Sequence, residues 1–247
     1  MRLLSFAVLL ALCGCSQQEM LERFASKEDQ ASAKARVEQL RSGDFEGIEK
    51  DLDPSLKGPG LMATLQKMSG AVPSGTPTSI TLVGAQQFRG PDYTSKNISF
   101  EYNFEGKWFL INVATKEKAG STTLMGLNVK PMAQSLEEQN KFTLQGKSAK
   151  HYAIFGSAIA AALLSLYSLV VCVRTPMPRR KWLWVVFILL GVGKLGINWS
   201  TGELLFAPLS VQLFSASAAA AFYGPFVVSV SLPLGAAIFL LRYWMRP

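Results

Sequence analysis

The pattern of apolar and polar residues divides the chain into two halves of different character. From residue 27 to residue 68, apolar residues recur at helical spacing among polar ones, and Gly43 and Pro54 interrupt the pattern. Because glycine and proline commonly end helices, this stretch predicts three short helices. They are expected at residues 27–41, 45–52 and 61–68.

The following stretch, up to residue 130, changes to a period of two. Ile98, Phe100 and Tyr102 alternate with polar residues, which is typical of an antiparallel strand with one buried face. Turn residues separate four expected strands, at 78–88, 95–104, 107–115 and 121–130. Helices followed by an antiparallel meander predict an α+β domain, with the helices packed on one face of the sheet.

Apolar runs dominate the second half, and three of them are long enough to cross a bilayer, for which a helix needs about 20 residues. They predict an all-α bundle of three transmembrane helices, at residues 152–173, 182–199 and 223–241. The segment 200–222 is also apolar but contains Pro208. We expect it to form a periplasmic loop, and a re-entrant segment or a fourth span is the alternative.

Charge is distributed unevenly and gives the orientation of the expected spans. The formal net charge is +8, but residues 151–247 contain only one acidic residue, Glu203. The cations of this half mostly flank the apolar runs (Arg174, Arg179, Arg180, Lys181, Arg242 and Arg246). Loops rich in Lys and Arg stay in the cytoplasm, so the first half should lie outside and the C-terminus inside. No nucleic-acid partner is expected, because the charge is not concentrated on the first half.

The first residues have the pattern of an export signal. Arg2 precedes about ten apolar residues, which are too few to cross a bilayer, and the run ends in Leu12-Cys13-Gly14-Cys15. This ending resembles the lipobox of bacterial lipoproteins, although Cys13 departs from the usual small residue. The resemblance implies a signal peptide over 1–14, acylation of Cys15, and a lipidated N-terminus and linker over 15–29. An ordinary signal peptide that ends in cysteine is the alternative.

Two other segments resemble known families. The segment Leu40-Arg41-Ser42-Gly43-Asp44-Phe45 lies between two expected helices ahead of four strands, and this order is similar to the NTF2-like, cone-shaped fold. The resemblance implies a periplasmic α+β domain over 30–132, joined by a linker over 133–150 to a membrane domain over 151–247. The segment Asn198-Trp199-Ser200-Thr201-Gly202 resembles one in uncharacterised small bacterial membrane proteins, which implies no function.

Few residues are candidates for a functional role. Lys194 is the single charge inside an expected span, and intramembrane charge is costly and often functional. The simpler interpretation is that its amine reaches the headgroups. Together with Asn198 and Glu203, it forms the intramembrane polar site that the sequence predicts.

No catalytic residue, metal site or cofactor is expected. His151 is the single histidine, and it lies at the start of the membrane half, where a wetted interfacial residue is the default. The three cysteines have no spacing typical of a disulfide or a zinc site (Cys13, Cys15 and Cys172). Three residues could act as acid and base in a pocket, but we interpret them as surface groups (Asp92, Tyr93 and Glu101).

These features together predict a lipoprotein of the bacterial inner membrane that acts as a periplasmic binding or interaction module in an envelope complex. The expected partners are membrane lipids and either another protein or a second copy of the chain. One alternative is an enzyme acting on an amphiphilic small molecule in the pocket of the NTF2-like domain, which requires a buried carboxylate with a raised pKa. The other is an accessory subunit of a membrane transporter, which a hydrophilic cavity at Lys194 would favour.

Overall fold

The computed structural model describes residues 17–177 and 180–245 of the chain. The chain divides into two compact units, Met1–Leu136 and Glu137–Pro247, each with its own core. The expected signal peptide and Cys15 lie outside the described residues. The boundary between the units falls in the predicted linker, which contains the short helix α6 (Leu136–Gln139).

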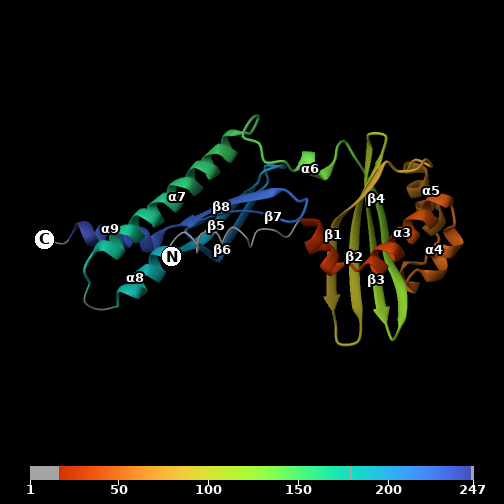
Figure 1. The fold of residues 1–247 in the computed structure, drawn as a ribbon, viewed down its shortest axis with the longest axis horizontal. Coiled ribbons are helices and arrows are strands. Elements are labelled where there is room, and N and C mark those ends of the chain that lie inside the picture. The colour runs from red at the N-terminus through yellow and green to blue at the C-terminus, as the bar shows by residue number, and fades with distance from the viewer. Residues whose placement is uncertain (1–16, 178–179, 246–247) are drawn as a thin grey trace, which may run out of the picture. The chain divides into compact units, whose positions relative to one another are not determined.

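The first unit begins with helices whose ends are set by local sequence (Figure 1). Ser26 and Asp29 form a reciprocal capping box at the start of one helix, and Gly43 ends this helix with a φ of +80°, which favours glycine. Asp44 then caps the next helix by accepting a hydrogen bond from the backbone N–H of Gly47. The helical segments are α2 (Gln17–Phe24), α3 (Lys27–Ser42), α4 (Phe45–Asp51), the 3-10 helix η1 (Pro54–Leu56) and α5 (Leu61–Ala71).

A four-stranded antiparallel sheet follows, with its strands in the order of the sequence. The strands are β1 (Ser79–Arg89), β2 (Thr94–Phe104), β3 (Lys107–Lys118) and β4 (Ser121–Met132). All four expected strands are therefore present, with small shifts at their ends. The turns that join β2 to β3 and β3 to β4 lie at the predicted positions, Glu105-Gly106 and Ala119-Gly120, and all four of these residues have positive φ.

The core of the first unit lies on one face of this sheet. Phe100 and Tyr102 of β2 are buried on it, and Phe100 stands opposite the buried Ile111 of β3. Helix α3 covers the same face, because the amine of Lys34 lies 5.3 Å from the centre of the Phe100 ring. Burial of the phenol raises the pKa of Tyr102 to about 12. The helices and the sheet thus form the α+β arrangement expected for this unit.

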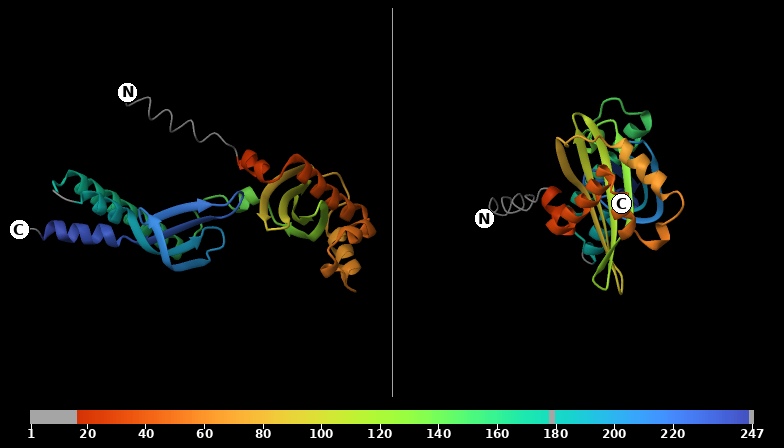
Figure 2. Two further views of the ribbon diagram at one scale, coloured as in Figure 1. Left: turned by 90° about the horizontal axis from the view of Figure 1, so that it is seen from below. Right: turned by 90° about the vertical axis from the view of Figure 1, so that its right-hand side faces the viewer.

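The second unit is not the bundle of three transmembrane helices that we expected. It contains a second antiparallel sheet, with strand order β6-β5-β8-β7 (Figures 1 and 2). The elements in chain order are α7 (Ala149–Arg174), α8 (Lys181–Leu189), β5 (Leu190–Asn198), β6 (Leu204–Leu213), β7 (Ala216–Ala220), β8 (Phe226–Leu232) and α9 (Leu234–Trp244). The first expected span is a helix, whereas the other two are each half helix and half strand. The expected loop at 200–222 holds two strands.

The physical reason for this difference lies in residue types that a hydropathy sum ignores. Three glycines fall within β5, at positions 191, 193 and 196, and Gly193 has a φ of +73° that a helix cannot contain. In β8, Val228 and Val230 alternate with Ser229 and Ser231, which is a period of two. These segments are apolar enough for a span, but their backbone preference is for strands.

Two clusters of buried side chains hold the second unit together. One joins Ile154 of α7 to Trp199 and to Val228 of β8. The other joins Cys172 of α7 to α8 and α9, where Phe239 is buried. Among the residues that the structure describes, α7 is the one helix long and apolar enough to cross a membrane, and α9 is a shorter apolar helix.

Candidate functional site

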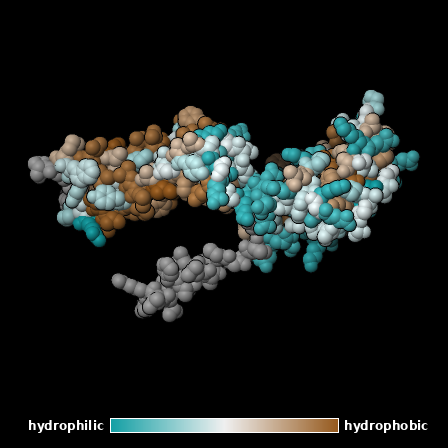
Figure 3. Space-filling view, turned by 90° about the horizontal axis from the view of Figure 1, so that it is seen from above, coloured by the Kyte–Doolittle hydropathy of each residue, from teal (hydrophilic) through white to brown (hydrophobic). Residues whose placement is uncertain are grey.

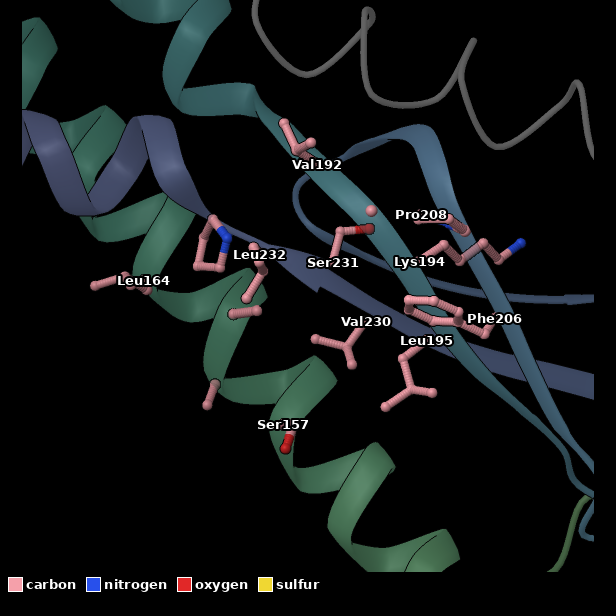
Figure 4. Close-up of a pocket in the computed structure, with 14 residues that line it drawn as sticks. Ser157, Leu164, Val192, Lys194, Leu195, Phe206, Pro208, Val230, Ser231 and Leu232 are labelled. Atoms are coloured by element: carbon pink, nitrogen blue, oxygen red, sulfur yellow. The ribbon is translucent and has the colours of Figure 1, made fainter.

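The second unit contains an apolar groove of about 750 Å³. Helix α7 forms one wall, and strands β5, β6 and β8 form the other (Figure 4). Most of its lining is hydrocarbon, and we define it by six residues: Ser157, Ala160, Lys194, Leu195, Phe206 and Val230. We call this cavity the Lys194 groove.

Small side chains and an irregular strand leave this space open. On α7 the wall is built from Leu164 and from three small residues, Ser157, Ala160 and Ala161. On the other side, the pairing register between β5 and β6 shifts between Val192 and Lys194, at the positive-φ Gly193. A bulge of this kind bends the strand.

Lys194 is the single charged residue that lines the groove, and it is half-buried. It stands opposite Ala207 in the sheet. Figure 4 shows its side chain extending past Pro208 of β6. Within residues 17–177 and 180–245, no ion pair involves Lys194. The anticipated partner, Glu203, precedes β6 and has an exposed side chain.

A buried polar network lies beside the groove. The side-chain amide of Gln212 in β6 donates hydrogen bonds to Ser217 (2.6 Å) and Ser229 (2.8 Å). Ser231, which lines the groove, donates to the amide oxygen of Gln212. Because these groups satisfy one another, the network is a structural tie between β6, β7 and β8.

Asn198 lies at one end of the second unit, where it shapes a turn. Its side-chain oxygen accepts hydrogen bonds from the backbone N–H groups of Ser200 (3.0 Å) and Thr201 (3.1 Å). The three predicted polar residues therefore play separate parts: Asn198 holds a turn, Glu203 is exposed beside it, and Lys194 lines the groove.

Two lysines and the single histidine lie at this same end. The amine of Lys147 donates to the carbonyl of Trp199 (2.7 Å), and that of Lys150 donates to the carbonyl of Gly202 (2.5 Å). His151 is buried, contrary to the wetted position expected for it; its Nδ1 lies 2.9 Å from the Ser148 hydroxyl, and its ring packs edge-on against Trp199. Its Nε2 has no hydrogen-bond partner in the described part of the chain.

The opposite end of the second unit is also cationic. The amine of Lys181 bonds to the carbonyl of Val173, and the guanidinium of Arg242 lies 5.7 Å from the centre of a Trp184 ring. Between the two ends, the exposed side chains are largely apolar.

In the first unit, the three candidate acid–base residues do not share a pocket. Asp92 is exposed and pairs with Lys118 at 2.6 Å, and this hydrogen bond lowers the pKa of Asp92. Tyr93 packs against Phe88. Glu101 is buried and accepts a hydrogen bond from the backbone N–H of Leu136, so its interpretation as a surface group was wrong.

A smaller polar cavity of about 210 Å³ lies between α3 and the sheet of the first unit. It contains the ion pair between Asp29 and Lys96, at 2.7 Å. Burial raises the pKa of Asp29, but hydrogen bonds from Lys96 and Ser26 outweigh it, so the pKa lies below its usual value. A carboxylate held ionised in this way is not the raised-pKa acid that the enzyme alternative needs. No cluster of potential metal ligands occurs among the residues described.

Comparisons with known proteins return no relative: no family model, no curated protein and no solved structure matches the chain. The resemblances to lipoproteins and to the NTF2-like fold therefore stay predictions from the sequence. The groove is the feature that sequence reasoning missed. The glycines of β5 and the small residues of α7 were its signals, but they indicate a cavity only once the two elements are known to face each other.

Proposed function

We propose that this protein is a membrane-anchored interaction module, with the second unit embedded in the bilayer and the first unit displayed on the side of Lys147 and Lys150. The observation that carries the proposal is the surface of the second unit. Large apolar side chains lie exposed all along it, between two cationic ends (Figure 3). Water does not stabilise an apolar surface of this extent, whereas lipid does.

Helix α7 is long enough to cross the hydrocarbon core of a bilayer. Its 26 residues, at a rise of 1.5 Å each, extend about 39 Å, which exceeds the hydrocarbon thickness of about 30 Å. The core helix of a water-soluble protein would be mostly buried. In α7, by contrast, only 28% of the most apolar 18-residue window is buried. Leu163, Tyr167 and Val173 are among the side chains that face outward.

The charges at the two ends support one orientation. Arg174, Lys181 and Arg242 gather at one end, where they would meet the cytoplasmic headgroups. Trp199 and the lysines of the other end would then lie at the outer interface; tryptophan is enriched at both interfaces and does not itself select the orientation. The first unit would lie in the periplasm, as the expected export signal and the predicted acylation of Cys15 also imply.

A role in binding follows from one edge of the second sheet. Strand β6 is an edge strand, and Leu205, Phe206 and Leu209 are exposed on it. The backbone groups of a free edge cannot be satisfied by hydrocarbon, so a protein chain must cover them inside the membrane. We therefore propose an envelope partner, or a second copy of this chain, along β6.

The test of membrane embedding compares two apolar residues of equal exposure. Leu163 on α7 is 61% exposed, and Phe88 on β1 is 60% exposed. Each is replaced by cysteine in a chain carrying Cys172→Ala, labelled with a polarity-sensitive fluorophore, and reconstituted into vesicles that contain a brominated lipid. We expect a blue-shifted, strongly quenched label at residue 163 and a water-like, unquenched label at residue 88.

Equal, water-like emission from both labels would rule out an embedded second unit. Quenching of both would instead place the first unit in lipid as well, against its role as a displayed module.

A further inference from the structure

We propose that the Lys194 groove binds one acyl chain of an anionic phospholipid, whose headgroup phosphate pairs with the amine of Lys194. This inference rests on the proposed function, because it requires the second unit to lie in a bilayer. It adds the class of ligand and the residues that select it.

The size and lining of the groove favour a hydrocarbon occupant. Protein interiors are close-packed, and a space of about 750 Å³ is as large as a typical small-molecule site. Leu195, Phe206 and Val230 supply an apolar wall that offers water few hydrogen bonds. In a bilayer, the hydrocarbon that surrounds the protein consists of lipid acyl chains.

The wall on α7 is shaped for a chain to lie along it. In its second half the outward face of this helix carries bulky residues such as Leu163, Leu166 and Tyr167. At the groove it carries Ser157 and Ala160, whose small side chains leave a recess on the exposed surface of the helix. The recess opens outward, so a chain can enter from the surrounding lipid.

The positive charge of Lys194 favours a ligand with an anionic headgroup. A lysine among apolar residues is costly unless an anion accompanies it, and the described residues offer Lys194 no carboxylate within salt-bridge distance. Its side chain lines the groove and extends past Pro208 of β6 (Figure 4). A molecule that fills the groove with a chain and meets the amine with a phosphate satisfies both requirements, and an anionic phospholipid is such a molecule.

The experiment measures which lipids stay with the full chain. Protein is reconstituted into vesicles of equal parts phosphatidylglycerol and phosphatidylethanolamine, extracted in mild detergent, and its tightly bound lipid is quantified by mass spectrometry. We expect phosphatidylglycerol to be enriched, and Lys194→Gln to lower that enrichment about fivefold, as expected for the loss of one lysine–headgroup contact. The control Lys130→Gln, at an exposed position of β4 in the first unit, should leave it unchanged.

A second pair of variants tests the chain. Ala160→Phe fills the groove and should remove most of the retained lipid, whereas Ala153→Phe, at an exposed position of α7 outside the groove, should not. The inference is overturned if Lys194→Gln and Ala160→Phe both retain phosphatidylglycerol as the wild type does. It is also overturned if Ala160→Phe loses lipid while Lys194→Gln keeps the preference for phosphatidylglycerol. Vesicle flotation separates the two proposals: a chain that does not float contradicts membrane embedding, whereas one that floats without these lipid effects contradicts only the groove.

Discussion

At the scale of single residues, polar groups in the first unit are placed by specific partners. Asp29 takes part in two such contacts: it closes the capping box of α3 with Ser26, and it pairs with Lys96 of β2. The capping box is a local feature, because Ser26 and Asp29 stand three positions apart in the sequence. The partner 67 residues away depends on the fold, because only packing of α3 on the sheet brings the two together.

This pair gives a pH-dependent prediction. A lowered pKa in the folded state means that the ionised form of Asp29 stabilises the fold above its ordinary value of 3.8, and that this stability is lost as the pH falls through the lowered pKa. Lys96→Met should cost about 0.5–1 kcal/mol at pH 7. Hydrogen exchange of α3 amides in the full chain should then be about two- to fivefold faster than in the wild type.

At a pH well below the lowered pKa of Asp29, that ratio should approach one, since protonation of Asp29 then removes the pair in the wild type. Lys130→Met, at an exposed position of β4, is the control that should leave the exchange of α3 unchanged at both pH values. A ratio that stays constant with pH would show that Lys96 acts through packing rather than through the ion pair.

At the scale of elements, the second sheet depends on close approach between its strands. Gly191 of β5 is an example, because a Cβ there would lie 2.7 Å from the Ser215 hydroxyl and 2.8 Å from the Cβ of Ser231. The turn residue Ser215 and the strand residue Ser231 therefore pack directly on the backbone of β5. Glycine is required at this position by space rather than by backbone conformation.

Gly191→Ala should destabilise the sheet by about 1–3 kcal/mol, the usual cost of overpacking. In the detergent-solubilised full chain, hydrogen exchange of the β5 and β8 amides should accelerate about fivefold or more. Gly156→Ala on α7 is the matched control, because a Cβ there meets no atom within 4 Å. That substitution should leave the sheet unchanged and favour the helix slightly. Equal effects of the two would mean that the contact at Gly191 relaxes freely.

At the scale of the whole molecule, the two units differ in what contacts the edge strands of their sheets. In the first unit, helix α2 packs against the edge strand β1, and the backbone N–H of Asp53 bonds to the carbonyl of Leu124 on the edge strand β4. These contacts leave less of either edge free to pair with other chains. In the second unit, the edge strand β6 instead carries exposed apolar residues, of which Leu209 is fully exposed. The second unit is therefore the part that we expect to assemble with other protein.

A photoreactive amino acid at Leu209, which lies on β6 outside the groove, tests this assembly in intact cells. We expect a discrete protein adduct, and mass spectrometry will identify it as a second copy or as another envelope protein. The same amino acid at Phe88, which is also exposed but lies in the first unit, is the control for nonspecific capture. Adducts to lipid alone at Leu209 would mean that the edge of β6 is not covered by protein.

The sequence by itself determined the division into two halves, the four strands of the first sheet and the apolar character of the second half. Those features follow from the period of apolar residues, from turn residues such as Gly106 and Gly120, and from local composition, all of which are visible within a short window of the chain. The tertiary structure alone decided the second sheet and the Lys194 groove. Hydropathy measures preference for lipid and not backbone conformation, so the runs at 182–199 and 223–241 resembled spans although half of each is a strand. The groove needs Ala160 and Phe206 to face each other across 46 positions of sequence, and only packing of α7 on the sheet provides that.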